Sequence, residues 1–196
     1  MPGSLITSCQ ILTYRLWGYL IFYGILEGPS VKRRRHFEPQ PPIDYPVGFF
    51  DGASQVNSEG CGIRLLLSDT HSFSCWMGID YSTNNFAELV VAWLLLFWAH
   101  HLAIREFGIF GDSRIVIVWL KGKVALHSIH ITHWCSRIKV LIPYFSFLSF
   151  KHIYRQFNLE ADRLSKQGLG GLNVILHFQE YMGSKVINEG YINIFW

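Results

Sequence analysis

The feature that most constrains the fold of this chain is an acidic residue within an apolar segment. Asp51 lies near the middle of residues 47–55, a short and mostly apolar run of the kind that forms a β-strand. A carboxylate with such neighbours is costly to bury unless it is paired or binds a metal ion. Whatever surrounds this strand must therefore supply a partner for Asp51.

Apolar periodicity predicts the elements around that strand. Alternating or short apolar runs predict five strands, and apolar residues at helical spacing predict the helices between and after them. The order of these elements predicts an α/β fold with a five-stranded mixed sheet and helices on its faces, in which the first three strands form an antiparallel meander. The expected strands span residues 47–55, 60–68, 72–80, 107–110 and 146–154, and the expected helices span residues 85–101, 113–120, 130–144 and 159–169.

Three further acids occupy distinctive places in this pattern. Glu88 opens the long apolar helix, Asp112 ends the fourth strand, and Asp162 lies in the first turn of the last helix. Each has a local explanation. Glu88 could close a capping box begun by Asn85, and Asp112 could cap the next helix. Asp162 could interact favourably with the dipole at the N-terminus of its helix. Convergence on divalent cations, which prefer oxygen ligands, explains these acids together with Asp51.

The residues that flank the four acids resemble the motifs of type 1 ribonuclease H. The resemblance is strongest to the ribonuclease H-like domains of plant retroelements, and it covers roughly residues 45–172. It implies a ribonuclease H-like fold and a metal-dependent endonuclease that cuts the RNA strand of RNA–DNA hybrids. The alternative is a nucleic-acid-binding module with little or no turnover. The matching segments are Asp51-Gly52-Ala53-Ser54, Thr83-Asn84-Asn85-Phe86-Ala87-Glu88-Leu89, Gly111-Asp112-Ser113 and Asn158-Leu159-Glu160-Ala161-Asp162.

The same resemblance implies roles for individual residues. Asp51 would bridge two Mg²⁺ or Mn²⁺ ions, Glu88 and Asp112 would hold one of them, and Asp162 would hold the other. His152, ten residues before Asp162, matches a histidine proposed to aid proton transfer or product release, although a structural role explains it equally well. The expected substrate contacts are Asn57, Asn84, Ser113 and Asn158, and turn or cap chemistry is the alternative for the asparagines.

Several positions depart from the family pattern. The glycine-rich turn of the family is replaced by Val56-Asn57-Ser58-Glu59, which we expect to place an acid near the phosphate path. The basic helical segment of bacterial enzymes is reduced to Lys121, Lys123 and His127. Arg155 and Lys166 are interpreted as solvated surface charges in preference to phosphate contacts. Aromatic side chains in the apolar run of residues 93–98 are expected to be exposed.

The termini and the composition add further expectations. Residues 1–44 form an apolar and then basic, proline-rich extension, and residues 173–196 form a tail without a clear period. A membrane tether through residues 5–26 is the minor interpretation, because Arg15 near its centre costs about 2.5–3.5 kcal/mol. Four cysteines without a C-x-x-C pair indicate a reducing compartment, the nucleus or the cytoplasm. We expect a monomer.

Overall fold

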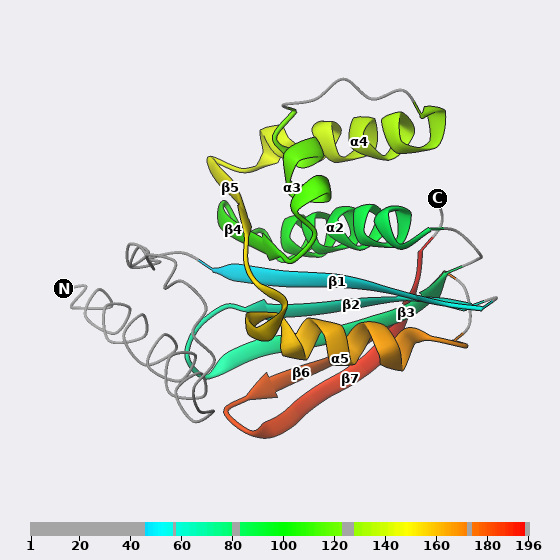
Figure 1. Ribbon diagram of the computed structural model, residues 1–196. Helices are drawn as coiled ribbons and strands as arrows, with labels where there is room; N and C mark the ends of the chain where they lie inside the picture. The colour runs from blue at the N-terminus through cyan, green and yellow to red at the C-terminus, as the bar shows by residue number, and fades with distance from the viewer. Residues whose placement is uncertain (1–45, 57, 80–82, 123–127, 172–173, 195–196) are drawn as a thin grey trace, which may run out of the picture. The chain divides into compact units, whose positions relative to one another are not determined.

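The computed structural model describes residues 46–56, 58–79, 83–122, 128–171 and 174–194. Its centre is a seven-stranded sheet with the order β5-β4-β1-β2-β3-β6-β7 (Figure 1). The strands are β1 (Val47–Gln55), β2 (Ser58–Leu66), β3 (His71–Ile79), β4 (Glu106–Gly111), β5 (Phe147–His152), β6 (Ile175–Met182) and β7 (Lys185–Asn193). The α-helices are α2 (Asn84–His101), α3 (Arg114–Leu120), α4 (Ile129–Leu141) and α5 (Leu159–Gly168).

The pairing of the strands confirms the mixed α/β sheet. Strands β1, β2 and β3 form an antiparallel meander, as the sequence predicts. Strand β4 pairs with β1 in parallel, and β5 pairs with β4 in parallel. These parallel pairs need crossover connections, which α2 and the α3–α4 segment provide.

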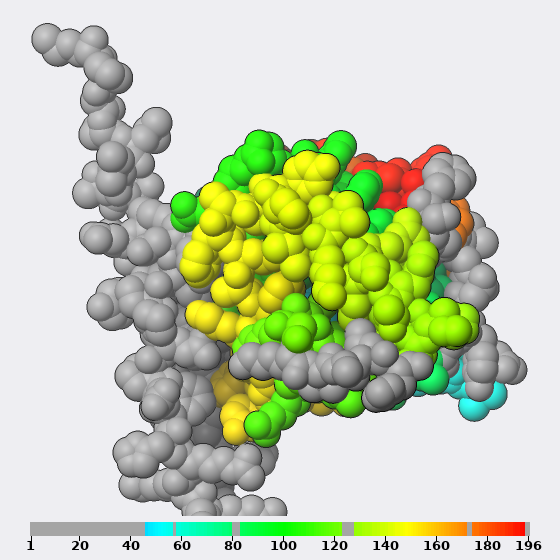
Figure 2. Space-filling model, turned by 90° about the horizontal axis from the view of Figure 1, so that it is seen from above, coloured from blue at the N-terminus to red at the C-terminus, as the bar shows by residue number. Residues whose placement is uncertain are grey.

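The helices cover both faces of the sheet. Helices α2, α3 and α4 lie on one side and α5 lies on the other (Figure 1). Helix α2 is buried on nearly all sides because it lies between the sheet and α4. Seen from above, α4 and the segment after it, in yellow and yellow-green, cover much of that face (Figure 2).

This layering corrects the expectation that the aromatic run of α2 is exposed. Trp93 and Trp98 are only 7% and 4% exposed, and the three leucines between them are fully buried. Trp134 of α4 packs edge-on against Trp93, with ring centroids 5.4 Å apart. A helix that is apolar all round is buried in the interior of a protein, and α2 follows that rule.

The number of strands is also corrected, from five to seven. The segment expected to be a tail forms β6 and β7, and β6 pairs antiparallel with the edge of β3. A tight turn joins the two strands. Its Gly183 has φ +61°, a backbone conformation that residues other than glycine rarely adopt. Because most side chains of β7 are exposed, the strand lacks the apolar alternation by which a strand is found in a sequence.

One smaller difference from the sequence predictions concerns a helix. The helix expected over residues 130–144 ends at Leu141 and continues as a 3-10 turn that contains Pro143, because proline cannot extend the α-helical hydrogen bonds. The interpretations of residues 1–44, including the segment 5–26, lie outside the described residues. Among the described residues, no helix is long and apolar enough to cross a membrane.

Two glycines allow helices to lie unusually close to the sheet. A Cβ atom on Gly62 of β2 would stand 2.2 Å from the backbone nitrogen of Ser165 and 2.3 Å from the carbonyl oxygen of Ala161, both in α5. A Cβ atom on Gly52 of β1 would stand 2.6 Å from the backbone nitrogen of Glu88 in α2. Because the obstructing atoms are backbone, no side-chain movement would relieve either clash.

We expect Gly62→Ala to lower the free energy of unfolding by about 1–3 kcal/mol or more, because the methyl group forces α5 away from β2. Gly190→Ala in β7 is the matched control, since its nearest neighbour is the ring of Phe178 at 3.1 Å, which can shift. Chemical denaturation of both variants measures the difference. Equal stability of the two variants would show that the close approach of α5 is not a constraint.

Candidate functional site

Asp51 lies at the centre of β1 on the face that α5 covers. Successive residues of a strand point to opposite faces, so Phe50 enters the core while Asp51 points away from it. The Asp51 side chain is buried, and its Oδ2 atom lies 2.9 Å from the Ser165 hydroxyl. The same hydroxyl lies 2.9 Å from the carbonyl oxygen of Asp162. It has one hydrogen, so it donates to one of these two oxygens at a time.

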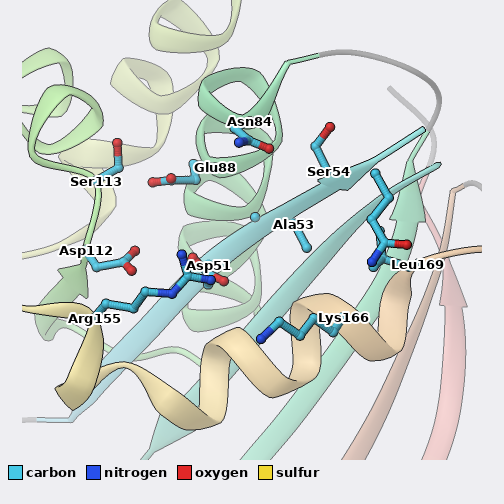
Figure 3. A pocket seen from close by; sticks show the side chains of 12 residues that line it. Asp51, Ala53, Ser54, Asn84, Glu88, Asp112, Ser113, Arg155, Lys166 and Leu169 are labelled. Atoms are coloured by element: carbon cyan, nitrogen blue, oxygen red, sulfur yellow. The ribbon is translucent and has the colours of Figure 1, made fainter. Parts of the chain in front are cut away.

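Glu88 reaches the site from the second turn of α2. The N-cap of this helix is Thr83, whose side chain accepts a hydrogen bond from the backbone nitrogen of Phe86. The capping-box interpretation of Asn85 and Glu88 is therefore wrong, because the helix begins earlier and has no acid in its first turn. The Glu88 carboxylate lines the pocket and points toward the side on which Asp112 and Ser113 lie (Figure 3).

Asp112 follows the last residue of β4. Because Gly111 of β4 is in register with Phe50 of β1, Asp112 comes to lie beside Asp51. The N-cap residue of α3 is Ser113, so the interpretation of Asp112 as the cap is wrong.

The three carboxylates from β1, α2 and the end of β4 converge. One oxygen from each of Asp51, Glu88 and Asp112 lies within 4.8 Å of the others (Figure 3). The Oε2 atom of Glu88 is buried and has no hydrogen-bond partner among the described residues. A group of oxygen ligands with one unsatisfied buried oxygen fits a hard divalent cation such as Mg²⁺ or Mn²⁺.

Burial and mutual repulsion perturb two of these acids strongly. Burial, and then the charge of Asp112, raise the pKa of Asp51 to about 7. Burial, and then the charges of Asp112 and Asp51, raise the pKa of Glu88 to about 8. Strong shifts of this kind in a pocket are typical of functional sites, and a bound cation would reverse the repulsion that causes them.

Asp162 is not part of the three-carboxylate group. It lies in the first turn of α5, where its Oδ1 atom pairs with Arg155 and its Oδ2 atom with Lys166, both at 2.5 Å. Burial raises the pKa of Asp162, but the hydrogen bonds and charges of Lys166 and Arg155 outweigh burial and hold it below its ordinary value. The structure thus brings three of the four predicted acids together and places the fourth among cations.

A pocket of about 440 Å³ opens over the acids. Two of the expected substrate contacts, Asn84 at the start of α2 and Ser113 after Asp112, line this pocket (Figure 3). Arg155 and Lys166 also line it, and both side chains are largely exposed, as the interpretation of them as solvated charges expects. Asn57 lies outside the described residues.

The other two expected site residues lie behind the pocket or at its side. Asn158 is 1% exposed and its Nδ2 atom donates to the carbonyl oxygen of Phe50 at 2.9 Å, so it joins α5 to β1 and does not line the pocket. His152 is the last residue of β5, and its Nε2 atom lies 3.1 Å from the carbonyl oxygen of Asp112.

The turn between β1 and β2 is shorter than the sequence suggested, so Ser58 and Glu59 already belong to β2. Glu59 is 1% exposed, and its Oε1 atom lies 3.4 Å from the Ser54 hydroxyl. Its side chain is therefore buried and does not line the pocket, and the place of this acid near a phosphate path stays a prediction.

Sequence reasoning missed Ser165 entirely. This residue is fully buried, and its hydroxyl group is within hydrogen-bond distance of the Asp51 carboxylate. Its position three residues after Asp162 puts both on one face of α5, and that spacing was the available signal. The contact with Asp51 depends on the packing of α5 against β1, which spacing alone does not specify.

Comparison with solved structures finds ribonuclease H folds. RNase H1 from the archaeon Halobacterium salinarum NRC-1 is 25% identical with a TM-score of 0.58, and the match covers 63% of this chain and 96% of that protein. The N-terminal RNase H domain of a Mycobacterium tuberculosis protein is 22% identical with a TM-score of 0.58, over 63% of this chain and 92% of that one. LC11-RNase H1, solved with an RNA/DNA hybrid, is 19% identical with a TM-score of 0.56, over 62% and 94%.

Comparison with curated proteins found no match. Comparison with protein families found a match that covers the four acids and most of the pocket lining and of the antiparallel meander. The match is to the family described as reverse transcriptase-like, and it spans residues 49–168, more than half of the chain. The chain therefore belongs to the reverse transcriptase-like family, whose fold is that of ribonuclease H.

Proposed function

We propose that the chain is a metal-dependent endonuclease that hydrolyses the RNA strand of RNA–DNA hybrids. The observation that carries this proposal is the convergence of Asp51, Glu88 and Asp112 around the unsatisfied Oε2 atom of Glu88. The family supports it, as do neighbours solved with an RNA/DNA hybrid, namely LC11-RNase H1 and the foamy viral protease–reverse transcriptase. We assign divalent magnesium or manganese, two ions in the full site, as the cofactor.

Each acid has a distinct part in this assignment. Asp51 is central to the three carboxylates, and Ser165 fixes its orientation. We assign Asp51 to both ions, Glu88 and Asp112 to the first, and Asp162 to the second. When bound, such ions lower the pKa of a water and stabilise charge on the leaving oxygen of a phosphodiester. The protein holds its carboxylates in place before the substrate arrives, which removes a cost of reorganisation.

Substrate selection falls to the polar residues of the pocket. Asn84 and Ser113 line the wall on the side of α2 and α3 and offer an amide and a hydroxyl. Such groups can bond the 2′-hydroxyl, which distinguishes an RNA strand from DNA. We assign these two residues to the RNA strand and Asn158 to positioning, because it holds α5 against β1.

The contact of His152 with Asp112 supports a role for this histidine at the site. If Nε2 carries the hydrogen, it donates to the Asp112 carbonyl oxygen at 3.1 Å. The other ring nitrogen is then free of a proton and can accept one. We assign His152 to proton transfer or product release on this basis.

The second candidate function is a nucleic-acid-binding module with little or no turnover. One observation favours it: Asp162, the fourth acid of the full site, is held by two cations and stands apart from the other three. Both functions require the pocket to accept a nucleic acid, so binding alone does not distinguish them. Only cleavage of the bound nucleic acid distinguishes the nuclease from the binding module.

We expect Asp51→Asn to abolish hybrid cleavage, because an amide keeps the shape of the carboxylate but loses its charge. Asp69→Asn, in the exposed turn between β2 and β3, removes the same charge outside the pocket and is the matched control. A labelled RNA–DNA hybrid incubated with Mg²⁺, and with EDTA in parallel, measures the activity of both. Cleavage by the wild type and by Asp69→Asn, but not by Asp51→Asn, is the expected result.

Other results of that assay contradict the proposal in different ways. Metal-dependent cleavage retained by Asp51→Asn would exclude the proposed mechanism. A wild-type protein that binds the hybrid without cutting it would support the binding module in place of the nuclease.

The raised pKa values predict that the metal-free protein loses stability as pH rises. Asp51 and Glu88 hold their protons more tightly in the folded state than in the unfolded state, with a folded pKa of about 7 and about 8. Their favourable contribution is complete below the unfolded values near pH 4 and is lost as pH rises through 7 and 8. We expect the Tm in EDTA to fall from pH 5 to pH 8, on the order of 5 °C.

Thermal denaturation of wild type and Asp51→Asn at several pH values measures this effect. We expect the variant to have the higher Tm at pH 8 and the flatter pH profile, and we expect Mg²⁺ to raise the Tm of the wild type more than that of the variant. Parallel profiles for the two proteins would contradict the assignment of the pH dependence to the three carboxylates.

A further inference from the structure

We propose that Arg155 and Lys166 compete with the second divalent ion for Asp162. The chain would then bind one ion at Asp51, Glu88 and Asp112 much more tightly than a second ion that needs Asp162. This inference rests on the metal site of the proposed function and concerns the order in which that site fills.

Both carboxylate oxygens of Asp162 already have a cationic partner. Arg155 Nη2 lies 2.5 Å from Oδ1, and Lys166 Nζ lies 2.5 Å from Oδ2. A divalent ion that takes the place of either cation at Asp162 must displace it, because charge-assisted hydrogen bonds of this length leave no room between the atoms. An ion that binds at a remaining lone pair of the carboxylate instead comes close to both positive charges and is repelled by them. Binding of the second ion at Asp162 therefore costs more free energy than binding at an ordinary carboxylate, which is surrounded by water alone.

The exposure of the three side chains shows which of them can move. The side chain of Asp162 is 12% exposed, whereas those of Arg155 and Lys166 are 70% and 56% exposed. The two cations can return to solvent, but the carboxylate cannot follow them. Displacement of both cations is therefore feasible without unfolding α5. It costs the free energy of the two partly exposed ion pairs that they form with Asp162.

The two cations come from different elements, and this makes the arrangement specific. Lys166 lies four residues after Asp162 on α5, the spacing at which helical side chains meet. Arg155 precedes the helix, in the 3-10 turn Arg155–Phe157, and extends across the pocket toward Asp51 (Figure 3). Its guanidinium group pairs with Asp162 and also feels the charges of Asp51 and Asp112.

The three-carboxylate group presents the opposite situation. No ion pair joins Asp51, Glu88 or Asp112 to a basic residue among the described parts of the chain. Asp51 is bonded to the neutral hydroxyl of Ser165, and Oε2 of Glu88 has no partner. An ion that enters here displaces none of the described cations and relieves repulsion among the acids. The site at Asp51, Glu88 and Asp112 is therefore expected to fill before a site that needs Asp162.

The same helix supplies a matched control. Arg163 pairs with Glu160 at 2.8 Å, and both side chains are about half exposed, at 55% and 47%. Neither residue lines the pocket. Arg163→Ala therefore removes one positive charge from α5 without freeing Asp162, which separates a local exchange from a general change in net charge.

The test is calorimetric titration of Mn²⁺ into the protein without nucleic acid. The variants are Arg155→Ala, Lys166→Ala, the double variant and Arg163→Ala. We expect two phases for the wild type, a tighter one and a weaker one. The double variant should tighten the weaker phase about tenfold relative to the tighter one, the size expected for the loss of two partly exposed ion pairs. Each single variant should give part of this effect, and Arg163→Ala should match the wild type.

Adding Asp162→Asn to the double variant should remove the weaker phase, which ties that phase to this carboxylate. An unchanged ratio of the two affinities in the double variant, or an equal change in Arg163→Ala, would overturn the inference while leaving the first ion site intact. Absence of Mn²⁺ binding in every protein would overturn the proposed metal site together with this inference. Circular dichroism confirms that each variant is folded before titration.

Discussion

The site depends on two helices lying closer to the sheet than most side chains allow. Gly62 admits the backbone of α5 against β2, and Gly52 admits the first turns of α2 against β1. The first contact brings Ser165 to Asp51, and the second brings Glu88 to the same place. Because a strand and a helix fix these positions, Asp51 and Glu88 are held by rigid elements, and Asp112 follows β4 directly. Rigid placement of this kind is what a preorganised site requires.

That closeness has an electrostatic cost, and the chain meets it in two ways. Asp51 and Glu88 are buried beside Asp112 and form no ion pair within the described parts of the chain, so burial and then the neighbouring negative charges raise their pKa values. Asp162 is also buried but has two cationic partners, and its pKa falls. One part of the site thus holds carboxylates that repel one another, while the carboxylate of the other part already pairs with two cations. In the proposed metal site, this asymmetry would link the stability of the metal-free protein to the order in which ions bind.

The sequence predicts the central fold well and the details of the site less well. A short, mostly apolar run located β1 with the bounds that the structure shows, and helical periodicity located α2 within one residue. The strands β6 and β7 were missed because exposed strands at a sheet edge lack apolar alternation. The convergence of three of the four acids followed from their places on or directly after strands and helices. The role of Asn158 was missed because it depends on how α5 packs against β1, which local patterns do not specify. The pair of Asp162 with Lys166 was missed although its spacing of four residues was an available signal, whereas the pair with Arg155 depends on the turn before α5.

The central claim is that Asp51, Glu88 and Asp112 together bind a divalent cation. A crystal soaked in Mn²⁺ tests it most directly, because anomalous scattering locates the ion without any assay of activity. The account predicts an anomalous peak within bonding distance of one oxygen from each of these three carboxylates, about 2.0–2.6 Å for ions with oxygen ligands. Saturating Mn²⁺ that gives no peak there, or carboxylates that turn away from one another, would contradict it.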